Sequence, residues 1–117
     1  RDEISVVSDQ IGTPTYAGDL ADVILKIITT KNTNFGLYHY SNEGQTSWYG
    51  FAKAIFEASN LKIKLNAIKT VAYPTPAKRP VYSVIDKTKI KKTLNIEISS
   101  WRETINNNSN FLWTNSI

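Results

Sequence analysis

Three groups of residues in this chain have types and spacings that could support chemistry. Tyr49 and Lys53 lie four positions apart, an arrangement in which a tyrosine donates a proton while a lysine lowers its pKa. Arg79 lies between two prolines, and its planar guanidinium matches the oxygens of a phosphate. Residues 9–15 place short polar side chains between a predicted strand and a predicted helix, where α/β folds bind anionic ligands.

Each group also has a purely structural explanation. Tyr49, Lys53 and Glu57 share a stripe beside the apolar face of one predicted helix, and no glycine-rich turn for a cofactor precedes them. We therefore predict that this pair is not catalytic. The local sequence favours a surface arginine in a proline-rich loop over a phosphate contact for Arg79, and residues 9–15 fit capping and turn chemistry equally well. The residues alone leave both of these alternatives open.

The remaining candidates are weaker. His39 stands in an apolar segment between two tyrosines, which is typical of a structural histidine rather than a catalyst. Lys87, Lys89, Lys91 and Lys92 have no interleaved aromatic residues, so we expect a solvated helix face rather than a nucleic-acid interface. The chain has no Cys and one His, which excludes disulfides, thiolate metal sites and multi-histidine metal sites.

Hydrophobic periodicity defines the elements that must position these residues. Residues 4–11 predict a strand, and apolar residues at helical spacing between Leu20 and Ile28 predict a helix with Thr15 as its N-cap. A short strand over residues 36–40 follows. A second helix is predicted from Ser47 to Ser59, with an apolar face made of Trp48, Phe51, Ala52, Ile55 and Phe56.

The second half of the chain is less regular. Residues 61–73 are mostly extended, three prolines forbid regular structure over residues 74–80, and residues 82–85 predict a short strand. Asp86 is expected to cap a short helix, and residues 100–103 form a capping box for a last helix. This order of elements predicts the α/β class. Without a glycine-rich turn, the chain holds no complete dinucleotide-binding unit.

Length and composition narrow the classes further. The 117 residues suit a single domain, and 41% hydrophobic with 21% charged residues is typical of a globular protein. No stretch is long enough to span a membrane, and no signal segment opens the chain, so we expect a cytoplasmic protein. Residues 60–96 carry a net charge of +8 and the rest of the chain −4, and this basic segment favours an anionic partner or merely solvated lysines.

The start of the chain is also informative. There is no Met, and Arg1, Asp2 and Glu3 lead at once into apolar residues. We therefore expect a piece of a longer protein, the alternative being a terminus left by removal of a tag.

Taken in order, these segments resemble the dTDP-4-dehydrorhamnose reductases. The run Asp9-Gln10-Ile11-Gly12-Thr13-Pro14-Thr15 is similar to the family's Asp-Gln-x-Gly-x-Pro-Thr segment, and residues 73–80 are similar to its Tyr-Pro-Thr-x-Ala-x-Arg-Pro segment. The resemblance continues through residues 36–39, 47–56 and 83–86 and through Trp101, and it weakens after Ile105. One departure is that many relatives carry an arginine where this chain has Gly12 and Thr13.

The resemblance implies an α/β fold, namely the C-terminal substrate-binding portion (residues 1–117) of an extended short-chain dehydrogenase of Rossmann type. Members reduce the C4 ketone of dTDP-4-dehydro-L-rhamnose to dTDP-L-rhamnose with NADPH. Their glycine-rich turn and catalytic Tyr-x-x-x-Lys pair lie in the N-terminal half, so this chain is expected to hold no catalytic, cofactor-binding or metal-binding residue. By the same resemblance Arg79 contacts the diphosphate, and Gln10 and Thr15 form walls of the site.

The expected partners follow from the same resemblance. They are a dTDP-sugar and the protein's own N-terminal Rossmann half, with no nucleic acid and no membrane, and the chain alone is expected to be inactive. A non-catalytic or regulatory nucleotide-sugar-binding relative remains the alternative, because the catalytic pair lies outside this chain. Residues 4–11 and 37–40 would each lack a strand neighbour, so we expect the isolated chain to self-associate or exchange strands.

Overall fold

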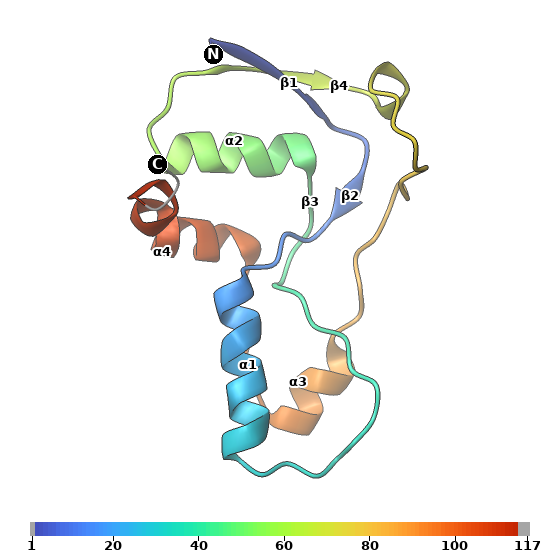
Figure 1. Cartoon of the computed structure of the whole chain (residues 1–117), viewed down its shortest axis with the longest axis vertical. Coiled ribbons are helices and arrows are strands. Elements are labelled where there is room, and N and C mark those ends of the chain that lie inside the picture. Colours follow the sequence, from blue (N-terminus) through green and yellow to red (C-terminus); the bar gives the residue numbers. More distant parts are fainter. Residues whose placement is uncertain (1, 115–117) are drawn as a thin grey trace.

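Strands and helices alternate along most of the chain (Figure 1), as the α/β prediction requires. The computed structural model describes residues 2–114, and the side chains of residues 2–108. In chain order the elements are β1 (Glu3–Val7), β2 (Ile11–Gly12), α1 (Ala17–Thr29), β3 (Thr46–Ser47), α2 (Trp48–Ala58), β4 (Lys64–Ile68), the 3-10 turn η1 (Thr70–Ala72), α3 (Thr88–Leu94) and α4 (Trp101–Thr114). None of these helices is long and apolar enough to cross a lipid bilayer.

Two small sheets organise the molecule. β1 and β4 pair in parallel, with Ile4 opposite Leu65 and Val7 opposite Ile68, while β2 and β3 pair antiparallel. Helix α2 runs along one side of the β1–β4 pair (Figure 1). Because β1 and β4 are parallel, their carboxyl ends lie at the same edge, and the residues that follow both strands meet there.

The packed centre of the chain lies between α2 and α4. Ala54, Trp101 and Ile105 are buried there, and the rings of Phe51 and Trp101 meet edge to face with centroids 6.2 Å apart. Among the residues whose side chains are described, Ile90 of α3 is the only other buried hydrophobic residue. The radius of gyration of 16.6 Å exceeds the roughly 13 Å expected of a compact domain of this length. The chain therefore encloses little core of its own.

Helix α1 forms over the predicted apolar periodicity, but its apolar face stays open. The helix extends away from the sheet (Figure 1), and it has no buried residue. Leu20, Ile24 and Ile28 are 39%, 49% and 64% exposed, although they share the face that should be inside. The described part of the chain thus leaves this face of α1 uncovered.

Several expected elements are wrong or differ in detail. Residues 36–40 form no strand, and residues 82–85 contribute only a single bridge between Tyr82 and Ile11. The strand expected over residues 4–11 is split into β1 and β2. Thr15 does not cap α1, because the N-cap residue is Tyr16 and the Thr15 hydroxyl donates instead to the carbonyl of Thr13.

The helix signals at the starts of α2 and α4 are confirmed, whereas the N-cap residue of α3 is Lys87 and Asp86 lies one residue before it. The Ser47 hydroxyl accepts a hydrogen bond from the amide of Gly50 at the start of α2, as an N-cap serine does. The Asp86 carboxylate accepts from the amide of Thr88 at 2.8 Å, ahead of α3. Ser100 accepts from the amide of Glu103 at the start of α4. Residues 74–80 have no regular structure, as their prolines require.

The start of α1 is held by a buried asparagine that no helix signal in the sequence indicates. Asn42 has no exposed surface, and its Oδ1 accepts from the Tyr16 amide at 2.8 Å. Its Nδ2 donates to the Asp19 carboxylate at 2.8 Å and to the Ser99 carbonyl at 3.1 Å. One side chain thereby joins α1, the segment before β3 and the segment before α4, with Thr104 completing the network at Asp19.

A second polar cluster holds α3 in place. Glu43 forms ion pairs with Lys87 at 3.2 Å and with Lys91 at 2.8 Å, and the Lys87 side chain is only 6% exposed. Lys87 also donates to the carbonyl of Ile85. The hydrogen bond from Lys91, with help from Lys87, lowers the pKa of Glu43 below its ordinary value of 4.5.

Replacing Glu43 with Gln is expected to lower the free energy of unfolding by about 1–2 kcal/mol at pH 7. The change leaves the buried Lys87 ammonium without its carboxylate, and the loss is moderated because Glu43 is itself 36% exposed. Since the folded pKa is depressed, this stabilisation is present above pH 4.5 and is lost as the pH falls through the folded pKa. Urea unfolding at several pH values measures both effects, with exposed Glu97→Gln as the control; equal losses in the two variants would contradict the account.

Candidate functional site

A cleft opens where the carboxyl ends of β1 and β4 meet. Its volume is about 780 Å³, within the usual range for small-molecule sites. It is lined by Ser5, Val6, Val7, Gln10, Ile11, Gly12, Thr13, Pro14, Thr46, Ser47, Trp48, Phe51, Tyr73, Thr75, Arg79, Pro80 and Ser83. Arg79 is the only charged residue among them. The cleft is thus a largely neutral surface, rich in hydroxyl and aromatic groups, with a single cation.

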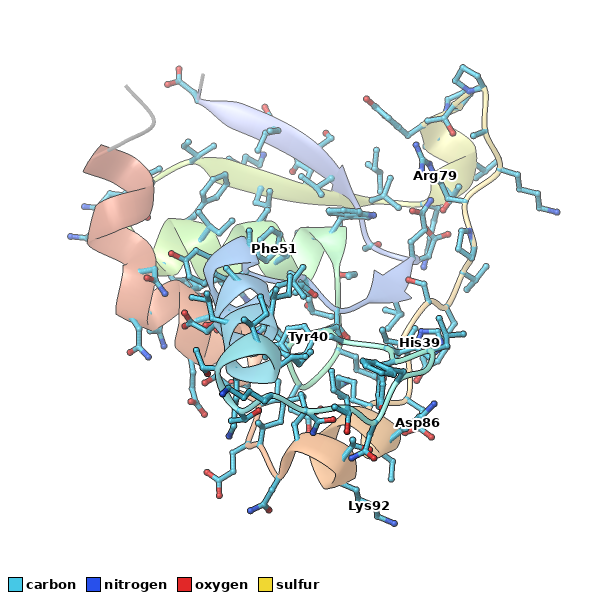
Figure 2. The ribbon with its side chains drawn as sticks, turned by 60° about the horizontal axis from the view of Figure 1, so that its bottom comes forward. His39, Tyr40, Phe51, Arg79, Asp86 and Lys92 are labelled. Carbon is cyan, nitrogen blue, oxygen red and sulfur yellow. The ribbon has the colours of Figure 1, made fainter. Side chains whose placement is uncertain are left out.

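Arg79 lies on the proline-rich loop that forms one wall of the cleft. Figure 2 shows it beside the 3-10 turn, near the ends of β1 and β4 and away from His39 and Asp86. Pro80 follows it and also lines the cleft. Among the described residues no carboxylate forms an ion pair with Arg79, so its donors are left for a ligand. Restricted backbone freedom at Pro80 lowers the entropy lost when this loop binds a ligand.

Gln10 lies on the same cleft as Arg79, directly after β1. Its side-chain Nε2 donates to the Thr70 hydroxyl at 3.2 Å, and its Oε1 accepts from the indole Nε1 of Trp48 at 3.3 Å. Thr70 is the first residue of η1, which follows β4. The parallel pairing of β1 and β4 therefore brings two residues that are 60 positions apart into contact.

Asp9, which directly precedes Gln10 in the chain, supports this arrangement. Its carboxylate accepts from the Thr70 hydroxyl at 2.5 Å and from the Thr70 amide at 2.9 Å. The hydroxyl bond is the main cause that lowers the pKa of Asp9 from its ordinary 3.8. Asp9 is thus an ionised acceptor that fixes Thr70.

Thr15, the third predicted site residue, is not among the residues that line the cleft. It is exposed, one residue before the N-cap of α1. Its neighbour Thr13 lines the cleft instead, and the Thr13 hydroxyl donates to the carbonyl of Gly44 at 2.6 Å. The structure brings Gln10 and Arg79 together on one cleft and leaves Thr15 outside it.

Gly12 has a packing role at the site. A Cβ atom built on Gly12 would lie 2.7 Å from the hydroxyl oxygen of Ser83, closer than real side chains allow. A larger residue here would therefore require the Ser83 side chain, which donates to the carbonyl of Ile11, to turn away.

Trp48 was expected in the apolar core face of α2, and the structure shows otherwise. The side chain is 58% exposed and lines the cleft, while Ala54 is the buried residue of the helix. Tyr73, also 58% exposed, lines the cleft as well. Sequence reasoning missed both. The available signal is its position, because Trp48 is the first residue of α2 after the capping Ser47.

The other candidates lie outside this cleft. His39 is exposed, in the irregular segment before Ser41 (Figure 2), and does not line it. Lys87 and Lys91 pair with Glu43, and Lys89 donates to the carbonyl of Leu37, so these lysines contact the chain itself. Among the described residues no group of three or more His, Cys, Asp or Glu side chains could hold a metal ion.

Comparison with known proteins places this chain in a family. The model of the RmlD substrate binding domain matches residues 1–112. The chain belongs to that family. Its mixed α/β structure and its match over nearly the whole length confirm the resemblance inferred from the residues.

Several relatives of this RmlD substrate binding domain are named dTDP-4-dehydrorhamnose reductase. The chain is 45% identical to dTDP-4-dehydrorhamnose reductase of Aggregatibacter actinomycetemcomitans over 92% of its own length and 40% of that protein. It is 41% identical to the spore coat polysaccharide biosynthesis protein SpsK of Bacillus subtilis, over 90% of the chain and 36% of that protein. The chain therefore spans about 40% of the length of the curated relatives that it matches.

Solved structures show the same fold. A dTDP-4-dehydrorhamnose reductase of Clostridium acetobutylicum superimposes with a TM-score of 0.88 at 39% identity, over 97% of this chain and 40% of that one. The reductase of Bacillus anthracis, solved in complex with NADP, superimposes with a TM-score of 0.85 at 40% identity, over 92% and 37%. The chain thus has the fold of a corresponding part of these extended short-chain dehydrogenases.

Within this RmlD substrate binding domain, the Tyr49–Lys53 pair lies apart from the cleft. Both residues line a separate hollow of about 460 Å³ with Glu57 and Leu65, and neither lines the cleft that contains Arg79. Lys53 and Glu57 are exposed, as expected of a solvent-facing stripe.

We expect Tyr49→Phe and Lys53→Ala to leave the kcat of the intact protein within about twofold of wild type, because neither side chain reaches the cleft. Steady-state kinetics on both variants measure this. A loss of a hundredfold or more in either variant would make the pair catalytic.

Proposed function

We propose that this chain is the C-terminal, nucleotide-sugar-binding portion of a dTDP-4-dehydrorhamnose reductase. One observation carries the proposal: Gln10 and Arg79, which belong to the two segments most similar to that family, line one cleft at the carboxyl ends of β1 and β4. Relatives at 45% and 36% identity bear that name. The reaction is the NADPH-dependent reduction of the C4 ketone of dTDP-4-dehydro-L-rhamnose to dTDP-L-rhamnose. A reaction that consumes NADPH and a nucleotide sugar fits a cytoplasmic protein.

In this proposal the chain binds and orients the substrate. Arg79 donates to diphosphate oxygens in a charge-assisted, bidentate geometry, since it is the only cation on the cleft. Hydroxyl groups of the lining, such as those of Thr46 and Ser83, are available for polar groups of the substrate. Holding the diphosphate and its substituents in one orientation lowers the entropy that must be lost before the substrate can react.

NADPH would be bound by the rest of the protein. The glycines of this chain form no glycine-rich turn between a strand and a helix, so its residues do not fit the dinucleotide phosphates. The cofactor supplies the hydride, and no residue of this chain is assigned to that step.

The function is tested by NADPH oxidation. Intact protein supplied with dTDP-4-dehydro-L-rhamnose should oxidise NADPH, and the 117-residue chain alone should not. Failure of the intact protein to oxidise NADPH while it still binds the nucleotide sugar would favour a non-catalytic or regulatory relative. Failure to bind the nucleotide sugar at all would refute the proposal.

The partner of this chain is proposed to be the Rossmann half of the same protein. The open face of α1, formed by Leu20, Ile24 and Ile28, is the kind of surface that a folded partner covers. The β1–β4 pair also has one unpaired edge on each strand within the described chain.

We therefore expect the isolated chain to self-associate at high concentration, whereas the intact protein keeps a fixed oligomeric state. Light scattering over a concentration series measures this, and Ile24→Asp with Ile28→Lys should reduce the association of the chain. The matched control is Thr29→Asp on the polar side of the same helix. A chain that stays monomeric at millimolar concentration would contradict the expectation.

A further inference from the structure

Trp48 stands out among the residues of the cleft. It is a large aromatic side chain, 58% exposed, on a concave surface that also carries the only cation of the lining. Single exposed apolar residues are common on protein surfaces. An exposed indole whose ring edge is fixed by hydrogen bonding, inside a cleft of about 780 Å³, is a different case.

The indole is held by a directed series of hydrogen bonds. Trp48 Nε1–H donates to Gln10 Oε1 at 3.3 Å, and Gln10 Nε2 donates to the Thr70 hydroxyl at 3.2 Å. That hydroxyl donates in turn to Asp9 Oδ1 at 2.5 Å. The Asp9 carboxylate can only accept hydrogen bonds, so the Thr70 hydroxyl donates to it and accepts from Gln10 Nε2. The Gln10 Oε1 is then the atom that accepts from the indole.

This arrangement fixes the edge of the indole, while the side chain remains 58% exposed. A ring that is already ordered loses little conformational entropy when a second flat ring stacks on it. Stacking on an aromatic side chain suits a nucleobase, because every base has a π-face. Apart from Arg79 the lining is uncharged, which suits a neutral pyrimidine ring better than a second charged group.

We propose that Trp48 is the stacking platform for the nucleobase of the bound nucleotide sugar, and that Gln10, Thr70 and Asp9 are positioning residues that hold its indole. The inference rests on the proposed function, and it adds the subsite that recognises the base. Arg79 holds the diphosphate and Trp48 holds the ring attached to its nucleoside end, both on one cleft. Tyr73 lines the same cleft, but no hydrogen bond from a described side chain fixes its ring, so we do not expect it to replace Trp48 as the stacking platform.

Calorimetric titration of the intact protein separates the base from the diphosphate. The probes are dTDP and inorganic pyrophosphate, and the variants are Trp48→Ala, Trp48→Phe and Arg79→Ala. We expect Trp48→Ala to weaken dTDP about 10- to 100-fold and to leave pyrophosphate within twofold. Trp48→Phe should stay within about fivefold of wild type, because a flat ring remains. Arg79→Ala should weaken both probes.

The positioning residues have their own readout. Gln10→Ala should weaken dTDP several-fold but not pyrophosphate, and should cause no further loss in the Trp48→Phe background, which has no Nε1. Equal losses in both backgrounds would show that Gln10 acts without Trp48 and would overturn the positioning role.

The outcomes separate the inference from the proposed function. Failure of the wild-type protein to bind dTDP would refute the proposed function and the inference together. Binding of dTDP with unchanged affinity in Trp48→Ala would overturn the inference alone. A fall in thermal stability of Trp48→Ala with unchanged dTDP affinity would also overturn it, since it would show that the rest of the protein covers the indole.

Discussion

Replacing Asn42 with leucine is expected to lower the free energy of unfolding by about 3–5 kcal/mol, the largest stability change foreseen for this chain. Asn42 has no exposed surface, so a leucine of similar size in its place leaves no room for water to take over its hydrogen bonds. The change leaves the Tyr16 amide at the start of α1 without an acceptor and removes a donor from the Asp19 carboxylate. The amide left without an acceptor is costly, and the Asp19 carboxylate keeps only its hydrogen bond from Thr104.

Urea unfolding of the intact protein, followed by circular dichroism, measures the change. Asn107→Ala is the matched control, because Asn107 is an exposed residue of α4, where alanine favours the helix. Leucine at position 42 with less than about 1 kcal/mol of destabilisation would show that this network does not hold α1.

Arg79→Ala should weaken binding of the dTDP-sugar by about tenfold or more, equivalent to roughly 1.5–3 kcal/mol. Its guanidinium is the only charged group that lines the cleft, and no described carboxylate pairs with it. No other residue of the lining can replace that charge. Because the lost contact is made to a group remote from the reacting ketone, we expect mainly a rise in KM.

The control for Arg79 is its neighbour Lys78→Ala. Lys78 is exposed on the same loop, but it does not line the cleft. Arg79→Lys should recover part of the affinity, since lysine keeps the charge and loses the bidentate geometry. Steady-state kinetics on the three variants measure the change in KM. An unchanged KM in Arg79→Ala, or an equal rise in Lys78→Ala, would remove Arg79 from the site.

Local signals predicted the helices well. The capping serines Ser47 and Ser100 and the apolar spacing of α1 and α2 act within a few residues, so they can be seen in the sequence. The Arg79 loop was also predictable, because prolines forbid regular structure whatever surrounds them. The resemblance to the family then joined Gln10 and Arg79 as residues of one site.

The predictions that were wrong concern residues whose structure depends on contacts with residues far away in the sequence. The segment 36–40 has strand-like residues but finds no strand partner in the described chain, so it remains irregular. No local signal marks Asn42, which is buried by contacts with residues 26 and 57 positions away. Thr15 was expected as a cap, but Asn42 binds the Tyr16 amide at that helix start. No periodicity or motif reports contacts of this kind.

What covers the apolar face of α1 also could not be predicted from the sequence pattern. The spacing of Leu20, Ile24 and Ile28 correctly indicated a helix with one face to bury, but it could not say what covers that face. The same holds for Trp48, whose apolar character suggested the core and whose position places it on the cleft.

The central claim is that the cleft at the carboxyl ends of β1 and β4 is the nucleotide-sugar site, and a crystal structure of the intact protein with dTDP-L-rhamnose tests it most directly. The account predicts the diphosphate within hydrogen-bond distance of the Arg79 guanidinium, with the nucleotide sugar lying in the cleft beside Gln10. A nucleotide sugar bound elsewhere, with the Arg79 cleft open to solvent, would contradict it.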